Sequence, residues 1–262
     1  MQKKNSENTR LLSSIPRSAF LILRSMPLAI ETCELTVEFH SGVKALQKLD
    51  LQVAPGEIYG FIGPNGAGKT TTMHVLLGFI AASSGTASIL GVDVRRAIAR
   101  QRIGYMPEQP QMYLFLTGRE LLIMAGRLFG MRGKALADRA EALIEKVGLS
   151  EAKDRRIAGY SRGMMQRIAL AQALINDPDL VILDEPTSGF DPIGRIEIRE
   201  IISDLKRAGK TVFFSSHELS EVEKVCDRVG IISRGRLVAE GGIASLVRTG
   251  ESLEQYFIRT LS

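Results

Sequence analysis

The stretch that decides the fold is Gly63-Pro64-Asn65-Gly66-Ala67-Gly68-Lys69-Thr70. It fits the pattern G-x-x-x-x-G-K-[ST] of a phosphate-binding loop. Its glycines leave room for a phosphate to approach the backbone, and consecutive N–H groups can form an anion nest. We expect a helix to begin near Gly68 and add its positive end, Lys69 to reach the β- and γ-phosphates, and Thr70 to bind Mg²⁺. The loop predicts nucleotide binding, but it suits GTPases, kinases and motors equally well.

The flanks of the loop supply the structural context that the motif needs. Residues 57–62 form an apolar run typical of a buried strand, and residues 71–80 have the character of a helix. Further along, an apolar strand at 180–183, a helix at 193–207 and a strand at 211–214 follow one another. This alternation predicts an α/β fold with a parallel sheet.

The region before the loop has a different periodicity. Cys33, Leu35, Val37 and Phe39 alternate with polar residues, and residues 49–53 repeat the rhythm. Alternation of this kind predicts antiparallel strands with one buried face. We therefore expect an N-terminal antiparallel β-subdomain, beginning near residue 31.

A helical segment interrupts the β-rich parts over about residues 108–160. Thr117 and Glu120 form a capping box ahead of a helix that reaches about Phe129. Residues 134–147 form a second amphipathic helix, which Gly148 ends. A third helix is expected from Ser161 to about Ile175.

The last hundred residues end in two smaller elements. Residues 229–233 and 236–239, joined at Arg234-Gly235, predict a hairpin. Apolar residues at helical spacing within 249–262 predict a short C-terminal helix that packs on the domain. The main domain is accordingly expected over residues 31–248.

Composition excludes some classes of protein. The net charge is +5, but residues 1–25 hold five basic residues and one acidic residue, so the rest is close to neutral. The body thus has no basic footprint for nucleic acid. Cys33 and Cys226 lie far apart, which favours a reduced, cytoplasmic setting without disulfides or a cysteine metal site. No apolar run approaches the length of a membrane span.

The first 30 residues are basic and predicted to be disordered. Arg24 interrupts the short apolar patch at 19–23, which argues against a signal peptide. Three interpretations stay open for this segment: a disordered tail, a weak contact with a membrane surface, or an upstream extension with the true start at Met26.

Several polar residues follow apolar strands, where ligands bind in open α/β sheets. Asp184 and Glu185 come directly after the strand at 180–183. We assign Asp184 to Mg²⁺ and Glu185 to the general base that faces the attacking water. His217 follows the strand at 211–214 and is either a γ-phosphate contact or a structural histidine. Ser161 is a natural N-cap, and its helix start is either a second anion site or simple capping.

Together these residues resemble the ATP-binding subunit of an ATP-binding cassette (ABC) transporter. Residues 63–71, which end in Thr71, are similar to the Walker A loop, and residues 180–185 to Walker B with its glutamate. Residues 160–164 occupy the place of the signature L-S-G-G-Q, and residues 188–191 that of the loop that crosses the dimer. His217 matches the switch histidine. The strings G-Y-S-R-G-M-M-Q-R and L-D-E-P-T-S-G-F-D-P resemble the subgroup that serves ABC-2-type, mostly exporting, permeases.

The resemblance implies a P-loop NTPase (RecA-like) core that binds and hydrolyses MgATP in a head-to-tail dimer. The loop of one cassette would hold ATP, and Ser161 and Gly163 of the other would cap it near Asp191. Closure of the dimer would drive a separate membrane permease through the helical insert. The chain would then lie peripherally on the cytoplasmic face of the cell membrane, without a nucleic-acid partner.

The chain departs from the family pattern at three places. Arg162 and Met164 replace the first glycine and the glutamine of the signature. Glu108 stands where many members have a glutamine that senses Mg²⁺, with Gln109 beside it, and either could serve. The aromatic residue that stacks on adenine corresponds to Phe39, with His40 as the alternative; Phe39 also fits the buried side of its strand.

Two other functions stay open at this point. One is a soluble ABC ATPase in assembly or repair, against which the single cassette and the neutral body argue. The other is a regulatory ATP-binding module with low turnover, which the altered signature allows.

Overall fold

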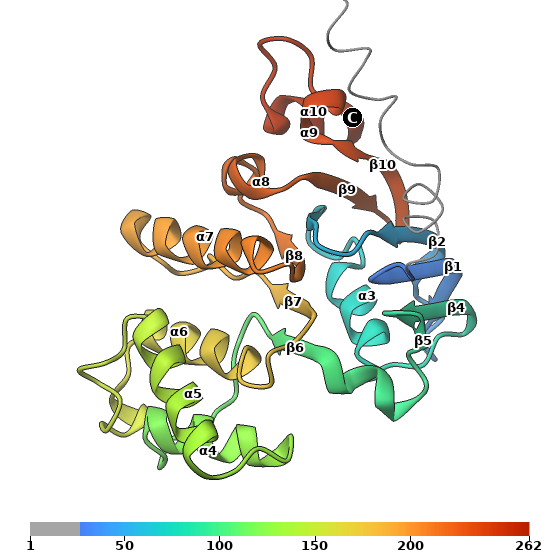
Figure 1. Ribbon diagram of the computed structural model, residues 1–262. Helices are drawn as coiled ribbons and strands as arrows, with labels where there is room; N and C mark the ends of the chain where they lie inside the picture. Colours follow the sequence, from blue (N-terminus) through green and yellow to red (C-terminus); the bar gives the residue numbers. More distant parts are fainter. Residues whose placement is uncertain (1–26, 262) are drawn as a thin grey trace, which may run out of the picture.

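Two sheets organise the chain, and the larger one carries the phosphate-binding loop (Figure 1). The computed structural model describes residues 27–261. The larger sheet has the order β10-β9-β3-β8-β7-β6, in which the neighbours from β9 to β6 pair in parallel and β10 pairs antiparallel to β9. Its strands are β3 (Ile58–Ile62), β6 (Ile103–Met106), β7 (Leu180–Asp184), β8 (Thr211–Ser216), β9 (Arg228–Ser233) and β10 (Arg236–Gly242). The parallel α/β core predicted from the sequence is confirmed.

The smaller sheet is antiparallel, as expected, with the order β2-β1-β4-β5. It comprises β1 (Ile30–Glu38), β2 (Lys44–Val53), β4 (Ser84–Ile89) and β5 (Val92–Asp93). One expectation for it was wrong, because Cys33 is exposed and Thr32 is buried in its place. The pairing of β1 shifts register between Thr32 and Leu35, where Glu34 takes a left-handed φ of 45°. Such a bulge moves the following side chains to the opposite face, so simple alternation failed.

Helices cover the larger sheet and extend beyond its edge (Figure 1). Their bounds are α3 (Lys69–Leu76), η1 (Ala97–Arg102), α4 (Gly118–Leu128), α5 (Gly133–Lys146), η2 (Ile157–Gly159), α6 (Arg162–Ala173), α7 (Pro192–Arg207), α8 (Leu219–Val225), α9 (Ile243–Leu246) and α10 (Leu253–Leu261). The helix after the loop ends at Leu76 and not at 80, because Gly78 adopts a φ of 72° that a helix cannot continue.

Both faces of the larger sheet are buried, which explains why its strands read as unbroken apolar runs. Along β3, Ile58 and Ile62 join the core beneath the helices, whereas Tyr59 and Phe61 join the core between the two sheets. Side chains alternate faces along a strand, so each strand contributes to both cores. The strands of the larger sheet are therefore packed against side chains on both faces.

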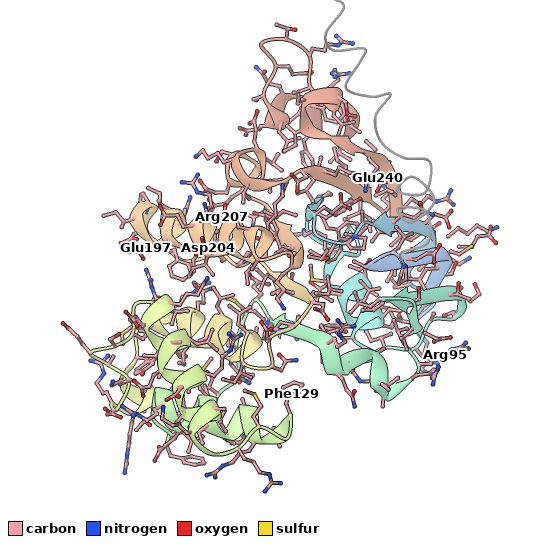
Figure 2. The ribbon with its side chains drawn as sticks, in the orientation of Figure 1. Arg95, Phe129, Glu197, Asp204, Arg207 and Glu240 are labelled. Atoms are coloured by element: carbon pink, nitrogen blue, oxygen red, sulfur yellow. The ribbon has the colours of Figure 1, made fainter. Side chains whose placement is uncertain are left out.

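The helices α4, α5 and α6 lie together at one end of the molecule (Figure 1). The capping box predicted at Thr117 and Glu120 is present in both directions at the start of α4. The predicted apolar face of α5 is buried, and the helix ends at Lys146, with Val147 as its C-cap and Gly148 following at positive φ. Glu197 lies on α7 and faces the helical group (Figure 2). It pairs with Arg167 of α6, so an ion pair joins this group to α7.

The remaining predictions concern the two ends of the chain. β9 and β10 form the expected hairpin, with Arg234 and Gly235 both at positive φ in its turn. α10 packs on the core through the buried Leu253. The segment 1–25, for which the sequence left three interpretations, lies outside the described residues. Between residues 27 and 261, no helix is both long enough and apolar enough to cross a bilayer.

Candidate functional site

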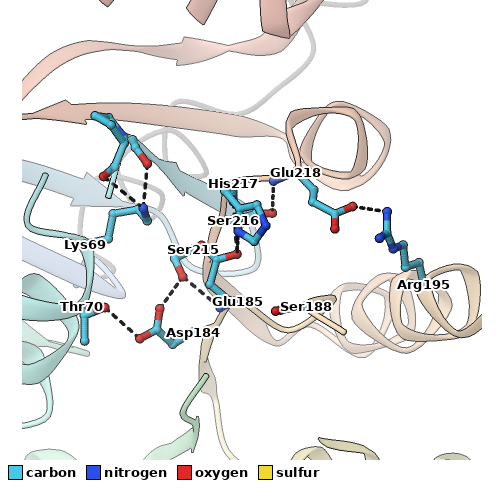
Figure 3. A network of polar contacts seen from close by, with 12 residues as sticks. Lys69, Thr70, Asp184, Glu185, Ser188, Arg195, Ser215, Ser216, His217 and Glu218 are labelled. Carbon is cyan, nitrogen blue, oxygen red and sulfur yellow. Dashed lines mark hydrogen bonds and ion pairs between the residues drawn. The ribbon is translucent and has the colours of Figure 1, made fainter. Parts of the chain in front are cut away.

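The predicted polar residues gather because their strands are neighbours in the sheet. The phosphate-binding loop follows β3, His217 follows β8, Asp184 ends β7, and Glu108 comes after β6. The order β3-β8-β7-β6 places these four carboxyl ends in sequence along one edge. Parallel strands direct their carboxyl ends to the same edge, which is where α/β proteins bind ligands. Figure 3 shows the resulting network of polar contacts.

The phosphate-binding loop has the conformation of an open anion cradle. Gly66 has a φ of 77°, and a Cβ there would meet no atom within 4 Å, so the space above it is free for a ligand. Gly68 has a φ of 113° and caps α3, and a Cβ there would lie 2.8 Å from the Ala45 carbonyl oxygen. Gly68 is thus required by β2 packing as well as by the backbone angle. The first N–H groups of α3 have no partners within the helix, so the start of this helix can receive an anion.

Lys69 lies with its ammonium group inside the loop. Its Nζ donates to the Gly63 carbonyl at 2.7 Å and to the Pro64 carbonyl at 3.4 Å (Figure 3). The side chain is buried, so the charge has little access to water. A phosphate in the cradle would offer this desolvated cation a charged acceptor, which is a stronger partner than two carbonyls.

Asp184 is held on both of its oxygens. Thr70 donates from Oγ1 to Oδ2 at 3.1 Å, and Ser215 donates from Oγ to Oδ1 at 2.5 Å (Figure 3). The Glu185 N–H in turn donates to the Ser215 hydroxyl at 3.0 Å. This arrangement fixes a buried carboxylate beside the hydroxyl expected to bind Mg²⁺.

Glu185 and His217 form a direct pair. His217 Nδ1 lies 2.7 Å from Glu185 Oε2, and the His217 N–H donates to the same oxygen at 3.2 Å. The carboxylate is buried, whereas the imidazole is 56% exposed. Glu185 has a left-handed φ of 53°. The backbone therefore leaves the extended conformation of β7 directly after Asp184. The pair has the geometry of a base with an orienting partner, since each group is within hydrogen-bond reach of the other.

Tyr105 of β6 lies near this cluster. Burial of its ring raises the pKa of Tyr105 to about 12, and the charge of Asp184 adds to the shift. The phenol therefore stays neutral at every physiological pH.

The residues present fit MgATP. Mg²⁺ usually takes one or two protein groups and completes its octahedron with substrate phosphates and water. Thr70 and Asp184 offer such a partial set, and within the part of the chain described no three His, Cys, Asp or Glu side chains form a metal cluster. The open cradle at Gly66 supplies the space for the phosphates.

Other predicted site residues make contacts of their own, at the starts of α6 and α7. The Ser161 Oγ accepts from the Met164 N–H at 3.3 Å, so the serine caps α6 as expected, and Gly163 follows in the first turn. Asp191 caps α7, with Oδ1 accepting from the Gly194 N–H at 2.7 Å. The roles of Ser161, Gly163 and Asp191 toward a nucleotide stay predictions.

The structure also places Phe39 and Glu108. The Phe39 ring is 40% exposed, so it does not belong to the buried side of β1 and its face is accessible for stacking. Glu108 and Gln109 line one hollow of about 330 Å³ together with Arg162 and Gln166. The assignments of Phe39 to adenine and of Glu108 to Mg²⁺ stay predictions.

The unusual Arg162 of the signature reaches the loop 188–191. Its Nη2 donates to Ser188 Oγ at 3.4 Å, and its guanidinium lies over Gly189, where a Cβ would come within 2.7 Å of Nε. The arginine that replaces a signature glycine therefore extends toward the loop 188–191 of its own chain.

Sequence reasoning missed three polar residues of the network. Ser215 bridges Asp184 and Glu185, while Arg195 and Glu218 join α7 to the segment after β8. The signal for Ser215 was present, because a buried serine pair ends the apolar strand β8. Nothing in the sequence pairs Arg195 with Glu218, which lie 23 residues apart.

Comparison with known proteins agrees with this geometry. A family model described as ABC transporter matches residues 46–188, which is more than half of the chain. The chain belongs to the ABC transporter family. It is an ATPase of that family, and its core is the P-loop NTPase fold expected from the loop.

Individual relatives of this ABC ATPase are similar over most of its length. An ABC transporter ATP-binding protein of Synechocystis sp. is 44% identical over 233 residues, which cover 86% of this chain and 66% of the relative. The Nod factor export ATP-binding protein I of Paraburkholderia xenovorans is 42% identical over 201 residues, covering 76% and 66%. A solved ATP-binding subunit of an ABC transporter superposes with a TM-score of 0.83 at 28% identity, covering 90% of this chain and 100% of that one. The chain thus spans about two thirds of the length of the two sequence relatives.

Proposed function

We propose that this cassette drives a separate membrane permease, in the export direction, from the cytoplasmic face of the membrane. Two copies pair head to tail, so that ATP on the Lys69 loop of one copy is capped by Ser161 and Gly163 of the other. Similarity to a Nod factor export ATP-binding protein supports export, and the substrate of this chain is carried by its permease.

One observation carries this proposal: the nucleotide-binding side chains and the start of α6 make their contacts separately within one chain. Lys69, Thr70, Asp184, Glu185 and His217 converge at one sheet edge and leave the cradle open at Gly66. The Ser161 hydroxyl accepts within its own helix, and in this proposal the N-terminus of α6 serves as a second anion site for the nucleotide of the other copy. A second copy would bring these two halves together, and the γ-phosphate would gain donors from both chains.

The residues at the sheet edge have distinct roles in this proposal. Lys69 and the loop N–H groups bind the phosphates, while Thr70 and Asp184 hold Mg²⁺, which supplies charge neutralisation when bound. Glu185 accepts a proton from the attacking water at its carboxylate. His217, which contacts Glu185 Oε2, orients that carboxylate and donates toward the γ-phosphate. Glu185 is buried, which limits the access of bulk water to its carboxylate.

The substitution Glu185→Gln tests the catalytic assignment. It removes the base but keeps the shape of the side chain, so ATP should still bind while kcat falls by about 10²-fold or more. The matched control is Glu145→Gln on α5, an exposed carboxylate far from the sheet edge in sequence and fold. Size-exclusion chromatography of Glu185→Gln should also show a dimer that forms with ATP. Near-normal hydrolysis by Glu185→Gln would overturn the role of Glu185.

Membrane partnership requires its own experiment. The native chain should co-purify with a polytopic membrane protein, and that protein should stimulate its ATPase activity. Recovery of the native chain away from membranes would favour an assembly or repair ATPase. Hydrolysis that stays negligible with the permease present would favour a regulatory module, as Arg162 and Met164 in the signature would allow.

A further inference from the structure

The loop 188–191 leads from the carboxylates of β7 into α7. It is a tight turn, in which the Ser188 N–H donates to the Glu185 carbonyl at 3.1 Å and Gly189 has a φ of 80°. Asp191 then caps α7. The position of this loop is therefore tied through the backbone to Glu185, three residues before it.

Arg195, in the first turn of α7, connects this loop to a different part of the chain. Its Nε donates to the Phe190 carbonyl at 3.3 Å, and its Nη1 pairs with Glu218 Oε2 (Figure 3). The side chains of Arg195 and Glu218 are 33% and 19% exposed. A partly buried ion pair is screened less than a fully exposed one, and the planar guanidinium can make both contacts at once.

Glu218 is itself a fixed anchor beside the switch histidine. Its N–H donates to Ser216 Oγ at 3.0 Å, and its carbonyl accepts from the Glu221 N–H at the start of α8. His217, the preceding residue, contacts Glu185. The contacts therefore close a ring that runs from Glu185 through the loop, Arg195, Glu218 and His217 back to Glu185.

We propose that Arg195 is a positioning residue that couples the loop 188–191 to His217, so that a shift of the loop changes the His217–Glu185 contact. This inference rests on the proposed function, in which the second cassette meets the loop. Docking of that copy would displace the loop. Because Arg195 bonds both to the Phe190 carbonyl and to Glu218, the displacement would also shift Glu218 and the adjacent His217. Hydrolysis would thereby depend on whether the second copy is present, because Glu185 is oriented by His217.

The chain contains a matched control for this role. One turn further along α7, Arg199 Nε lies 3.2 Å from Glu221 Oε2 of α8. This pair likewise joins α7 to the region after β8, and its side chains are 19% and 9% exposed. Arg199 has no contact with the loop, so Arg199→Gln removes a comparable ion pair without cutting the ring.

The first measurement needs no nucleotide. The full chain contains three histidines, so imidazole signals can be followed by two-dimensional NMR in each variant. Arg195→Gln should shift the signals of His217, assigned with His217→Gln, while those of His40 and His74 stay in place. Arg199→Gln should shift none of the three. Unchanged His217 signals in Arg195→Gln would overturn the proposal.

The second measurement separates coupling from folding. Arg195→Gln should lower kcat roughly tenfold while the Kd for ATP stays within about twofold, as expected for a change in coupling. Glu218→Gln should cause a similar loss, and the double variant should lose no more than either single variant. Losses that multiply in the double variant, or equal losses in Arg199→Gln, would contradict the coupling. If wild type hydrolyses no ATP while Arg195→Gln still shifts His217, the proposed function fails and the coupling holds.

Discussion

Ser215→Ala is the perturbation for which the structure gives the clearest magnitude. The Ser215 hydroxyl is fully buried and makes two hydrogen bonds, one donated to Asp184 Oδ1 and one accepted from the Glu185 N–H. A bond to a charged group contributes about 1.5–3 kcal/mol and a neutral one about 1 kcal/mol. Because alanine leaves both partners buried and unpaired, we expect a loss of about 2–4 kcal/mol in the free energy of unfolding.

The neighbouring serine provides the control for this prediction. Ser216 is equally buried, and its hydroxyl accepts one bond, from the Glu218 N–H. Ser216→Ala should therefore cost about 1 kcal/mol. In urea unfolding without nucleotide, Ser215→Ala should lose at least twice as much stability as Ser216→Ala. For a chain of this size, the Tm of each variant should fall by roughly 2–4 °C for each kcal/mol of unfolding free energy that is lost.

The same substitution has a functional consequence that packing alone would not produce. Ser215 orients Asp184, whose other oxygen accepts from Thr70. Loss of a group that orients a metal ligand typically weakens metal affinity by about 10- to 100-fold. We expect the Mg²⁺ concentration for half-maximal ATPase activity to rise by that factor in Ser215→Ala and to stay constant in Ser216→Ala. Equal Mg²⁺ midpoints in the two variants would refute the reasoning.

Two further predictions concern single side chains of the same region. Lys69→Ala removes the buried ammonium group from the phosphate cradle, so ATP binding followed by calorimetry should be lost while the urea midpoint changes little; tight binding by this variant would contradict our interpretation of the loop. Burial raises the pKa of Tyr105 to about 12, above the value near 10 of an exposed tyrosine. The folded state thus favours the neutral phenol, so this stabilisation is complete below pH 10 and is lost as the pH rises toward 12. Wild type should lose stability more steeply than Tyr105→Phe between pH 10 and 12, and parallel curves would disprove the shift.

The local elements of this protein could be predicted from the sequence because their signals are local. The capping box at Thr117, the glycine stop at Gly148 and the hairpin turn at Arg234-Gly235 depend on neighbouring residues. The apolar runs of β3 and β7 were equally clear, since burial on both faces leaves no polar interruption. Cys33 was placed wrongly because a bulge at Glu34 depends on pairing with β2, which alternation within one strand does not report.

The sequence by itself determined which chemical groups this ABC ATPase carries: a phosphate loop with Lys69, two carboxylates after a buried strand, and a histidine after another. The tertiary structure decided how these groups meet. Only the strand order β3-β8-β7-β6 brings loops from distant parts of the chain to one edge. It also placed Ser215 between the carboxylates and joined Arg195 to Glu218. The physical reason is that sheet pairing and ion pairs act through space, so they depend on register and proximity that no local pattern of residues encodes.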